Sequence, residues 1–120
     1  MYDARLIGKW KSDKRRTMQD VAARRDISAR SRSVLKRILG KLELRYTRTH
    51  VHSTFEELSD VERYEVVAKN DSSVVTVSVH PLYGKRIQHK HFDGQYYWVS
   101  LGRYREYFKH IGKTKRRIEL

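Results

Sequence analysis

Two pairs of histidines are spaced so that each pair could hold one metal ion. His50 and His52 form one pair, and His89 and His91 form the other. Residues two apart on a β-strand point to the same face, and imidazole nitrogens are common metal ligands. A four-histidine metal or haem site is therefore one hypothesis. The favoured alternative is that these are polar strand residues that bind no metal, so no cofactor is predicted.

The sequence offers little for covalent or acid–base catalysis. It has no cysteine, no Gly-x-Ser-x-Gly motif and no glycine-rich phosphate loop. Its acidic residues gather in the middle of the chain, where Glu56, Glu57, Asp60 and Glu62 are best interpreted as a solvated connection. These patterns favour a binding protein over an enzyme.

Basic residues far outnumber acidic ones. The chain of 120 residues has 27 Lys and Arg against 14 Asp and Glu, a formal net charge of +13. Residues 1–50 hold fifteen basic and five acidic side chains, residues 51–84 hold two and six, and residues 85–120 hold ten and three. If the two basic ends meet in the fold, they form one positive surface that attracts polyanions.

Aromatic residues accompany this charge, a combination that binds single-stranded nucleic acids. Tyr83, Tyr96, Tyr97 and Trp98 lie in or beside basic strands. The same aromatics also fit cross-strand core pairs, which is the favoured interpretation for most of them. The basic residues assigned to a nucleic-acid interface are Arg24, Arg25, Arg32, Lys36, Arg37, Lys85 and Arg86.

The spacing of apolar residues predicts the elements that carry these side chains. Residues 6–11 predict an opening strand, and two short amphipathic helices follow it before residue 40. From residue 41 onward the period changes to two, which predicts six or seven antiparallel strands. Asp93-Gly94 is the clearest hairpin turn, because a type I′ turn needs positive φ at both central positions.

Several short motifs in these elements resemble the calycin superfamily, which includes lipocalins and intracellular fatty-acid-binding proteins. Gly8-Lys9-Trp10-Lys11 looks like the G-x-W motif of that superfamily's first strand, and the two helices look like the lid inserted after it. Ser53-Thr54-Phe55 is similar to a later strand segment, and Arg105-Glu106-Tyr107 to the Arg-x-Tyr that holds a ligand carboxylate. The resemblance implies a closed antiparallel barrel capped at one end by the helices.

The strand pattern supports a barrel independently of that resemblance. A meander of amphipathic strands must cover its apolar face or close upon itself. We therefore predict one α+β, mainly β domain over residues 1–112: a small antiparallel up-and-down β-barrel of about eight strands, with two short helices after the first. Residues 113–120 are predicted to form a basic tail.

Gly8 and Trp10 are assigned structural roles in this barrel. Trp10 is expected to plug its base, with Arg103 or Arg105 over the indole, because arginine commonly stacks on aromatic faces.

The resemblance also implies a small ligand in the barrel interior. Strand alternation divides the last strand into two faces, Arg103, Arg105, Tyr107 and Lys109 against Tyr104, Glu106, Phe108 and His110. If the first set faces inward, Arg105 and Tyr107 anchor an anionic, partly apolar ligand. If the strand is turned over, Tyr104 and Phe108 fill the core and the arginines are solvated, which apolarity alone favours. The residues assigned to the ligand are Arg103, Arg105, Tyr107, Tyr46, His89 and His91.

No apolar run has the length of a bilayer-spanning helix, and the first residues lack the apolar stretch of a secretory signal. The expected location is the cytoplasm. The expected partners are the small ligand and, as the alternative function, nucleic acid or another polyanion.

Overall fold

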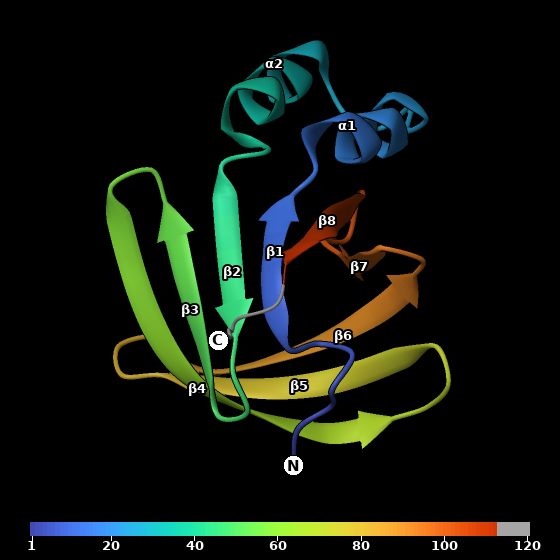
Figure 1. Cartoon of the computed structure of the whole chain (residues 1–120). Coiled ribbons are helices and arrows are strands. Elements are labelled where there is room, and N and C mark those ends of the chain that lie inside the picture. The colour runs from blue at the N-terminus through green and yellow to red at the C-terminus, as the bar shows by residue number, and fades with distance from the viewer. Residues whose placement is uncertain (113–120) are drawn as a thin grey trace.

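Eight antiparallel strands close into a barrel in this computed structural model, which describes residues 1–112 (Figure 1). Each strand pairs with its neighbours in the chain, and the last pairs with the first. The strands are β1 (Gly8–Ser12), β2 (Leu42–Tyr46), β3 (His50–Phe55), β4 (Leu58–Lys69), β5 (Ser73–His80), β6 (Gly84–Asp93), β7 (Tyr96–Ser100) and β8 (Arg105–Gly112). Two helices, α1 (Lys14–Ala22) and α2 (Ala29–Ile38), lie between β1 and β2. The predicted barrel is confirmed, and the predicted tail lies outside the described residues.

Alternation along the strands fills the barrel core with aromatic and β-branched side chains. The buried cluster comprises Leu6, Trp10, Tyr46, Tyr64, Val66, Val74, Tyr97, Val99 and Phe108. The Trp10 indole N–H donates to the carbonyl oxygen of Leu6 at 2.9 Å, so its one polar atom is satisfied inside the core. The Trp10 ring packs edge-on against Tyr97 and His110, with centroid separations of 4.8 and 4.7 Å.

The two structural residues predicted from the sequence lie together in this core. Gly8 has φ +126°, and a Cβ there would lie 2.7 Å from both the Gly112 carbonyl oxygen and the His110 Nε2. Only glycine fits so close an approach. The predicted arginine over Trp10 is wrong: β8 presents Arg105 outside the barrel, where its guanidinium lies 3.8 Å from the Trp98 ring centroid.

Helix α1 completes the part of β8 that extends past the end of β1. The backbone N–H of Asp13 donates to the Tyr107 carbonyl oxygen at 2.8 Å. The Tyr107 N–H donates to the Thr17 hydroxyl at 2.9 Å, and the Arg105 N–H donates to the Asp20 carboxylate at 2.7 Å. Asp13, Thr17 and Asp20 recur at i, i+4 and i+7, so one helix face satisfies a strand edge that would otherwise be open.

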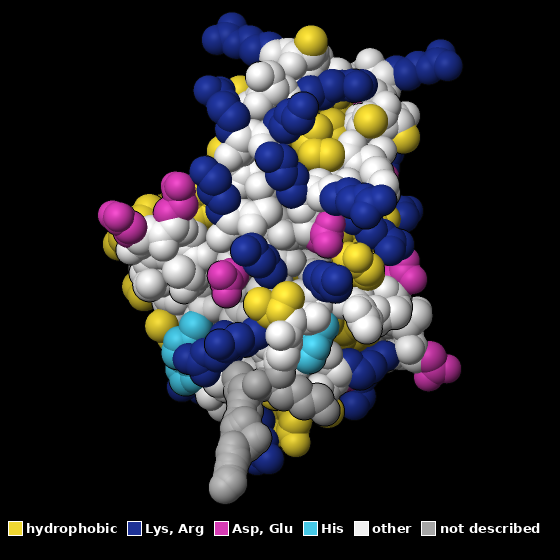
Figure 2. Space-filling model, turned by 45° about the horizontal axis from the view of Figure 1, so that its top comes forward, with side chains coloured by type: hydrophobic (Ala, Val, Ile, Leu, Met, Phe, Trp, Pro, Cys, Tyr) yellow, Lys and Arg dark blue, Asp and Glu magenta, His cyan; other side chains and the backbone are white. Residues whose placement is uncertain are grey.

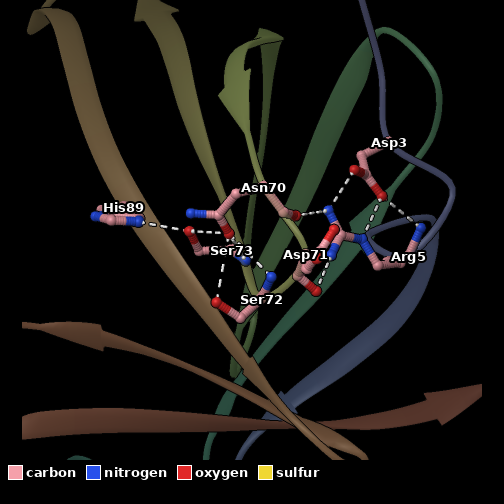
Figure 3. Close-up of polar contacts among 7 residues, drawn as sticks. All are labelled: Asp3, Arg5, Asn70, Asp71, Ser72, Ser73 and His89. Carbon is pink, nitrogen blue, oxygen red and sulfur yellow. Dashed lines mark hydrogen bonds and ion pairs between the residues drawn. The ribbon is translucent and has the colours of Figure 1, made fainter.

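The opposite end of the barrel is held by the N-terminal segment (Figure 3). Arg5 donates to the carbonyl oxygens of Asn70 and Asp71, both at 2.9 Å, and pairs with Asp3 at 2.8 Å. The hydrogen bonds from Arg5 lower the pKa of the Asp3 carboxyl. Asn70 organises the turn by accepting from the backbone N–H groups of Ser72 and Ser73. Leu6, which follows Arg5 in the chain, is fully buried and belongs to the core cluster.

Helix α2 stands apart from the barrel. It packs on α1 but on no strand, and none of its residues is buried. Ser28 caps its N-terminus by accepting from the Ser31 N–H at 3.1 Å. Neither helix of the described chain has the length and apolar character needed to cross a bilayer.

A polar cavity inside the barrel as the candidate functional site

A cavity of about 310 Å³ occupies the interior between the core aromatics and the helical end of the barrel. This volume is at the small end of the range for ligand pockets, about 300–1,000 Å³. Its apolar lining is Leu42, Leu44, Val51, Val99, Leu101 and Phe108. Its polar lining is Tyr46, Ser53, Glu62, Tyr64, Thr76, Ser78, Arg86, Gln88, Lys90, Tyr97 and Glu106. The interior of this barrel is therefore amphipathic and carries both signs of charge.

The last strand is turned over relative to the orientation that the ligand hypothesis required. Glu106 and Phe108 face the cavity, whereas Arg103, Arg105 and Tyr107 do not line it. Arg105 covers Trp98 on the outer surface, and Arg103 donates to the Asp26 carbonyl oxygen at 3.3 Å. Tyr107 is buried on the α1 side, with the Arg16 guanidinium 4.8 Å from its ring centroid. The predicted anchor is wrong, because burial of Phe108 fixes the alternation of β8.

Lys90 on β6 is the most unusual residue of the cavity, because its side chain is only 2% exposed. Its Nζ donates to the Thr76 hydroxyl at 2.6 Å and to the Gln88 side-chain oxygen at 3.0 Å. Within residues 1–112, no carboxylate accepts a hydrogen bond from it. Burial, reinforced by the positive charge of Arg86, lowers the pKa of the Lys90 amine to about 7. Two neutral acceptors satisfy a neutral amine, but an ammonium group has a third N–H to place.

Two buried tyrosines lie beside this amine. The Tyr46 and Tyr97 hydroxyls are 3.2 Å apart, and the Lys90 Nζ is 5.7 Å from the Tyr46 ring centroid. Burial raises the pKa of both tyrosines well above the ordinary value, so both stay protonated. One hydroxyl donates to the other, which leaves one hydroxyl hydrogen able to bind an acceptor in the cavity. Of the residues assigned to the ligand from the sequence, Tyr46 is the one that lines the cavity.

Acidic groups line the cavity nearer its helical end. Glu62 is 8% exposed, and its Oε2 accepts from the Arg86 guanidinium at 2.9 Å. Its other oxygen, Oε1, is buried and has no hydrogen-bond partner in the described chain. Glu106 accepts from the Ser12 hydroxyl at 3.0 Å, and burial raises the pKa of the Glu106 carboxyl. The interpretation of residues 56–62 as a wholly solvated connection is therefore wrong for Glu62.

The four-histidine metal site is also wrong. His50 and His52 lie on β3, His89 and His91 lie on β6, and two strands separate them. All four are outside the cavity. The His89 and His91 rings pack 4.0 Å apart, and the other face of His91 stacks on Trp98 at 4.0 Å. His89 and His91 are thus part of an outer stack with Trp98 and Arg105, and they do not contact an interior ligand.

The predicted nucleic-acid residues separate into three groups. Arg25, Lys36 and Arg37 are exposed on the helical region, and Lys85 is exposed on β6. Arg24 pairs with Asp20 at 3.2 Å, and Arg32 donates to the Ile27 carbonyl oxygen at 3.1 Å, so both brace the helices. Arg86 is held by Glu62 at the cavity. Lys and Arg side chains cover the helical end with few acidic side chains among them (Figure 2).

The aromatic residues that the nucleic-acid hypothesis would use for base stacking mostly contact other residues of the protein. Tyr97 is 1% exposed in the core, and the Arg16 guanidinium lies 4.6 Å from the Tyr96 ring centroid. Trp98 has His91 on one face and Arg105 on the other. Tyr83 is exposed on the β5–β6 turn and stacks on His80. The favoured interpretation, that most of these aromatics pack within the fold, agrees with these contacts.

Sequence reasoning did not assign Lys90 to the cavity, because β6 has basic residues on both faces, and it placed Glu62 in a solvated connection because acidic residues surround it in the chain. The usable signal was the Asp93-Gly94 turn, which pairs Phe92 with Tyr97. Once Tyr97 faces inward, alternation places residues 92, 90, 88 and 86 inward as well.

The cavity thus offers the amine of Lys90 beside the Tyr46–Tyr97 hydroxyl pair, one free carboxylate oxygen of Glu62, and apolar side chains lining the remainder. Comparison with models of protein families, with the curated proteins and with the solved structures finds no match to this chain.

Proposed function

We propose that this protein is a non-enzymatic binding protein whose barrel holds one small, partly apolar ligand with an acidic group. Lys90 and the Tyr46–Tyr97 hydroxyl pair hold that group. The observation that carries the proposal is the buried amine of Lys90, which has only neutral hydrogen-bond partners in the described chain. Burying an unpaired cation is costly, whereas an anionic ligand would supply the missing partner.

The surroundings of Lys90 suit an acid with an apolar chain. The free hydroxyl hydrogen of the tyrosine pair adds a second donor for a carboxylate. Leu44, Val51 and Phe108 provide apolar contact beyond this end of the cavity. A calycin-like fold is compatible with the closed barrel and with its helices after β1. The anchor proposed here lies on β6 in place of the Arg-x-Tyr motif.

The test compares decanoate binding to the wild type, to Lys90→Met and to Lys85→Met by calorimetry. Lys85 is the matched control, because it is an exposed lysine on the same strand. A charge-assisted hydrogen bond predicts that Lys90→Met weakens binding about tenfold or more while Lys85→Met leaves it unchanged. Decanol, which lacks the carboxylate, should bind the wild type and Lys90→Met with equal affinity. Equal decanoate affinity in the wild type and Lys90→Met would refute the anchor.

A second candidate function, polyanion binding at the helical end, is favoured by a separate observation. Helix α2 buries none of its residues, and exposed Arg25, Arg30, Lys36 and Arg37 lie on it or in the connection before it. We propose that this end contacts phosphates or sulfates. The contact is independent of the cavity, so the two functions can be tested separately.

A further inference from the structure

Glu62 is a buried carboxylate that the fold satisfies on one oxygen only. It lies on β4 between outward-facing neighbours, and its side chain enters the same cavity as Lys90. Arg86 donates to its Oε2 through a single nitrogen, although a guanidinium can engage both oxygens of a carboxylate. The buried Oε1 is left with no donor in the described chain. Such groups are rare in native proteins and call for a physical explanation.

A metal ion is the first explanation to consider, because ligand atoms of Asp60, Glu62 and His80 lie within 4.8 Å of one another. The hydrogen bonds of His80 argue against it. Its Nδ1 accepts from the backbone N–H groups of Leu82 and Tyr83 at 3.0 and 3.3 Å. The ring proton is therefore on Nε2, which donates to Asp60 at 2.9 Å. A metal on Nε2 would have to displace that proton while Nδ1 still acts as an acceptor.

We propose instead that Glu62 Oε1 accepts a hydrogen bond from the ligand, so that the cavity selects acids that carry a hydroxyl or ammonium group at the far end of a short apolar chain. This inference rests on the proposed function and adds the chemistry of the ligand's second end. Lys90 is the acid-binding pole beside the tyrosine pair, and Glu62 is the donor-binding pole beside Arg86.

The geometry sets an approximate spacing between the two poles. Arg86, which holds Glu62, and Lys90 are four residues apart on β6. At about 3.3 Å per residue their backbones are roughly 13 Å apart along the strand, and the Lys90 Nζ reaches back to the Gln88 side chain, which lies between them. Leu44, Val51 and Val99 line the same cavity. Glu62 and Glu106 both line it, so carboxylates on two walls of the cavity disfavour a ligand acid, and Lys90 is where such an acid finds an amine.

The test measures the selectivity of the wild type before any substitution is made. Calorimetric titrations compare decanoate, 10-hydroxydecanoate and 10-aminodecanoate, with the eight- and twelve-carbon series to vary the spacing. We expect the hydroxyl or ammonium form of one chain length to bind about tenfold or more tightly than the plain acid. A hydroxyl preference identifies a neutral donor, and an ammonium preference identifies a cationic one; either supports the proposal.

Glu62→Gln then tests whether Glu62 is the source of that selectivity. The amide oxygen will face Arg86, so the amide NH₂ replaces Oε1 in the cavity, and the preference for the ammonium probe should disappear. Glu65→Gln is the matched control, because Glu65 is on the same strand and its side chain is 70% exposed.

Three outcomes would overturn the inference. They are no preference for either donor, a preference for the ammonium probe that persists in Glu62→Gln, or one-to-one Zn²⁺ binding that is lost in both Glu62→Gln and His80→Gln. If decanoate still binds in a Lys90-dependent way in these cases, the proposed function stands and only the role of Glu62 fails. If no acid binds, the proposed function fails with it.

Discussion

Lys90 and Glu62 are buried ionisable residues that do not pair with each other by a hydrogen bond. Glu62 pairs with Arg86, and Lys90 contacts Thr76 and Gln88. A buried ion pair leaves no group free for a ligand, whereas this arrangement leaves an amine and a carboxylate oxygen available in one cavity. The separation of these two residues is the feature of the interior that is hardest to explain by stability alone.

The free energy of unfolding should depend on pH through Lys90. The pKa of this amine is about 7 in the folded protein and about 10.4 in an unfolded chain. Between these values the unfolded state binds more protons, so stability rises with pH over this window. Below pH 7 both states are protonated, and the whole burial penalty, roughly 5 kcal/mol as an upper bound, is present.

Urea unfolding of the wild type and Lys90→Met at pH 6 to 10 measures this effect. We expect the wild type to gain stability relative to Lys90→Met as pH rises from 7 to 10. Arg86, Glu62, Glu106, Tyr46 and Tyr97 share the cavity with Lys90, and because they are present in both proteins their titration largely cancels. Parallel stability curves for the two proteins would show that Lys90 titrates as an ordinary lysine.

At the scale of the elements, the pairing register of β6, β7 and β8 builds a stack on the outer surface. The register pairs His91 with Trp98 and Ser100 with Arg105. The rings of His89, His91 and Trp98 and the guanidinium of Arg105 then lie on one another in sequence. Burial, together with the neighbouring His89 and Arg105, lowers the pKa of His91.

The sequence predicted the elements better than it predicted which face of each strand is buried. The change of period at residue 41, the two helices and the Asp93-Gly94 turn were enough to give the barrel. Orientation was harder for β6 and β8, because polar and aromatic residues stand on both faces of these strands. Burial of Phe108 orients β8, and the pairing of Phe92 with Tyr97 orients β6. Both orientations depend on which residues meet when the barrel closes, and the local sequence pattern of one strand does not show this.

Removing the guanidinium from this stack should expose Trp98 selectively. In Arg105→Ala one face of the indole becomes accessible, so quenching of its fluorescence by acrylamide should increase. Trp10 is 2% exposed and does not contribute to the change. The lost cation–π contact predicts a small destabilisation of about 0.5–1 kcal/mol. Arg103→Ala is the control, and equal quenching in both variants would show that Arg105 does not cover Trp98 in solution.

At the scale of the whole molecule, closure of the barrel joins the two basic ends of the chain. β1 pairs with β8, so the condition for one shared positive surface, that these ends meet, holds for the described residues. Lys9 and Lys11 on β1 are exposed, Lys11 pairs with Lys109 on β8, and the helices extend the basic surface beyond the barrel end. The cavity and the basic helical end are thus built from different residues of one fold.

Polyanion binding at the helical end should be salt-dependent and should be lost when the α2 region is neutralised. The variant R25Q/R30Q/K36Q/R37Q removes four exposed charges there, and K9Q/K11Q/R63Q/K85Q removes four from outer strand faces. For single-stranded RNA, log Kd changes with log salt by about 0.7 per phosphate contacted, so four lost contacts reduce the slope by about 3.

Fluorescence anisotropy with labelled poly(U) between 50 and 200 mM salt measures the slope, with heparin as a competitor to separate RNA from polyanions in general. We expect the slope of log Kd against log salt to fall by about 3 in the helical variant and to change little in the strand variant. Both variants should bind decanoate with the affinity of the wild type. Equal losses in the two variants would show that net charge alone attracts the RNA and that the helical end is not a binding surface.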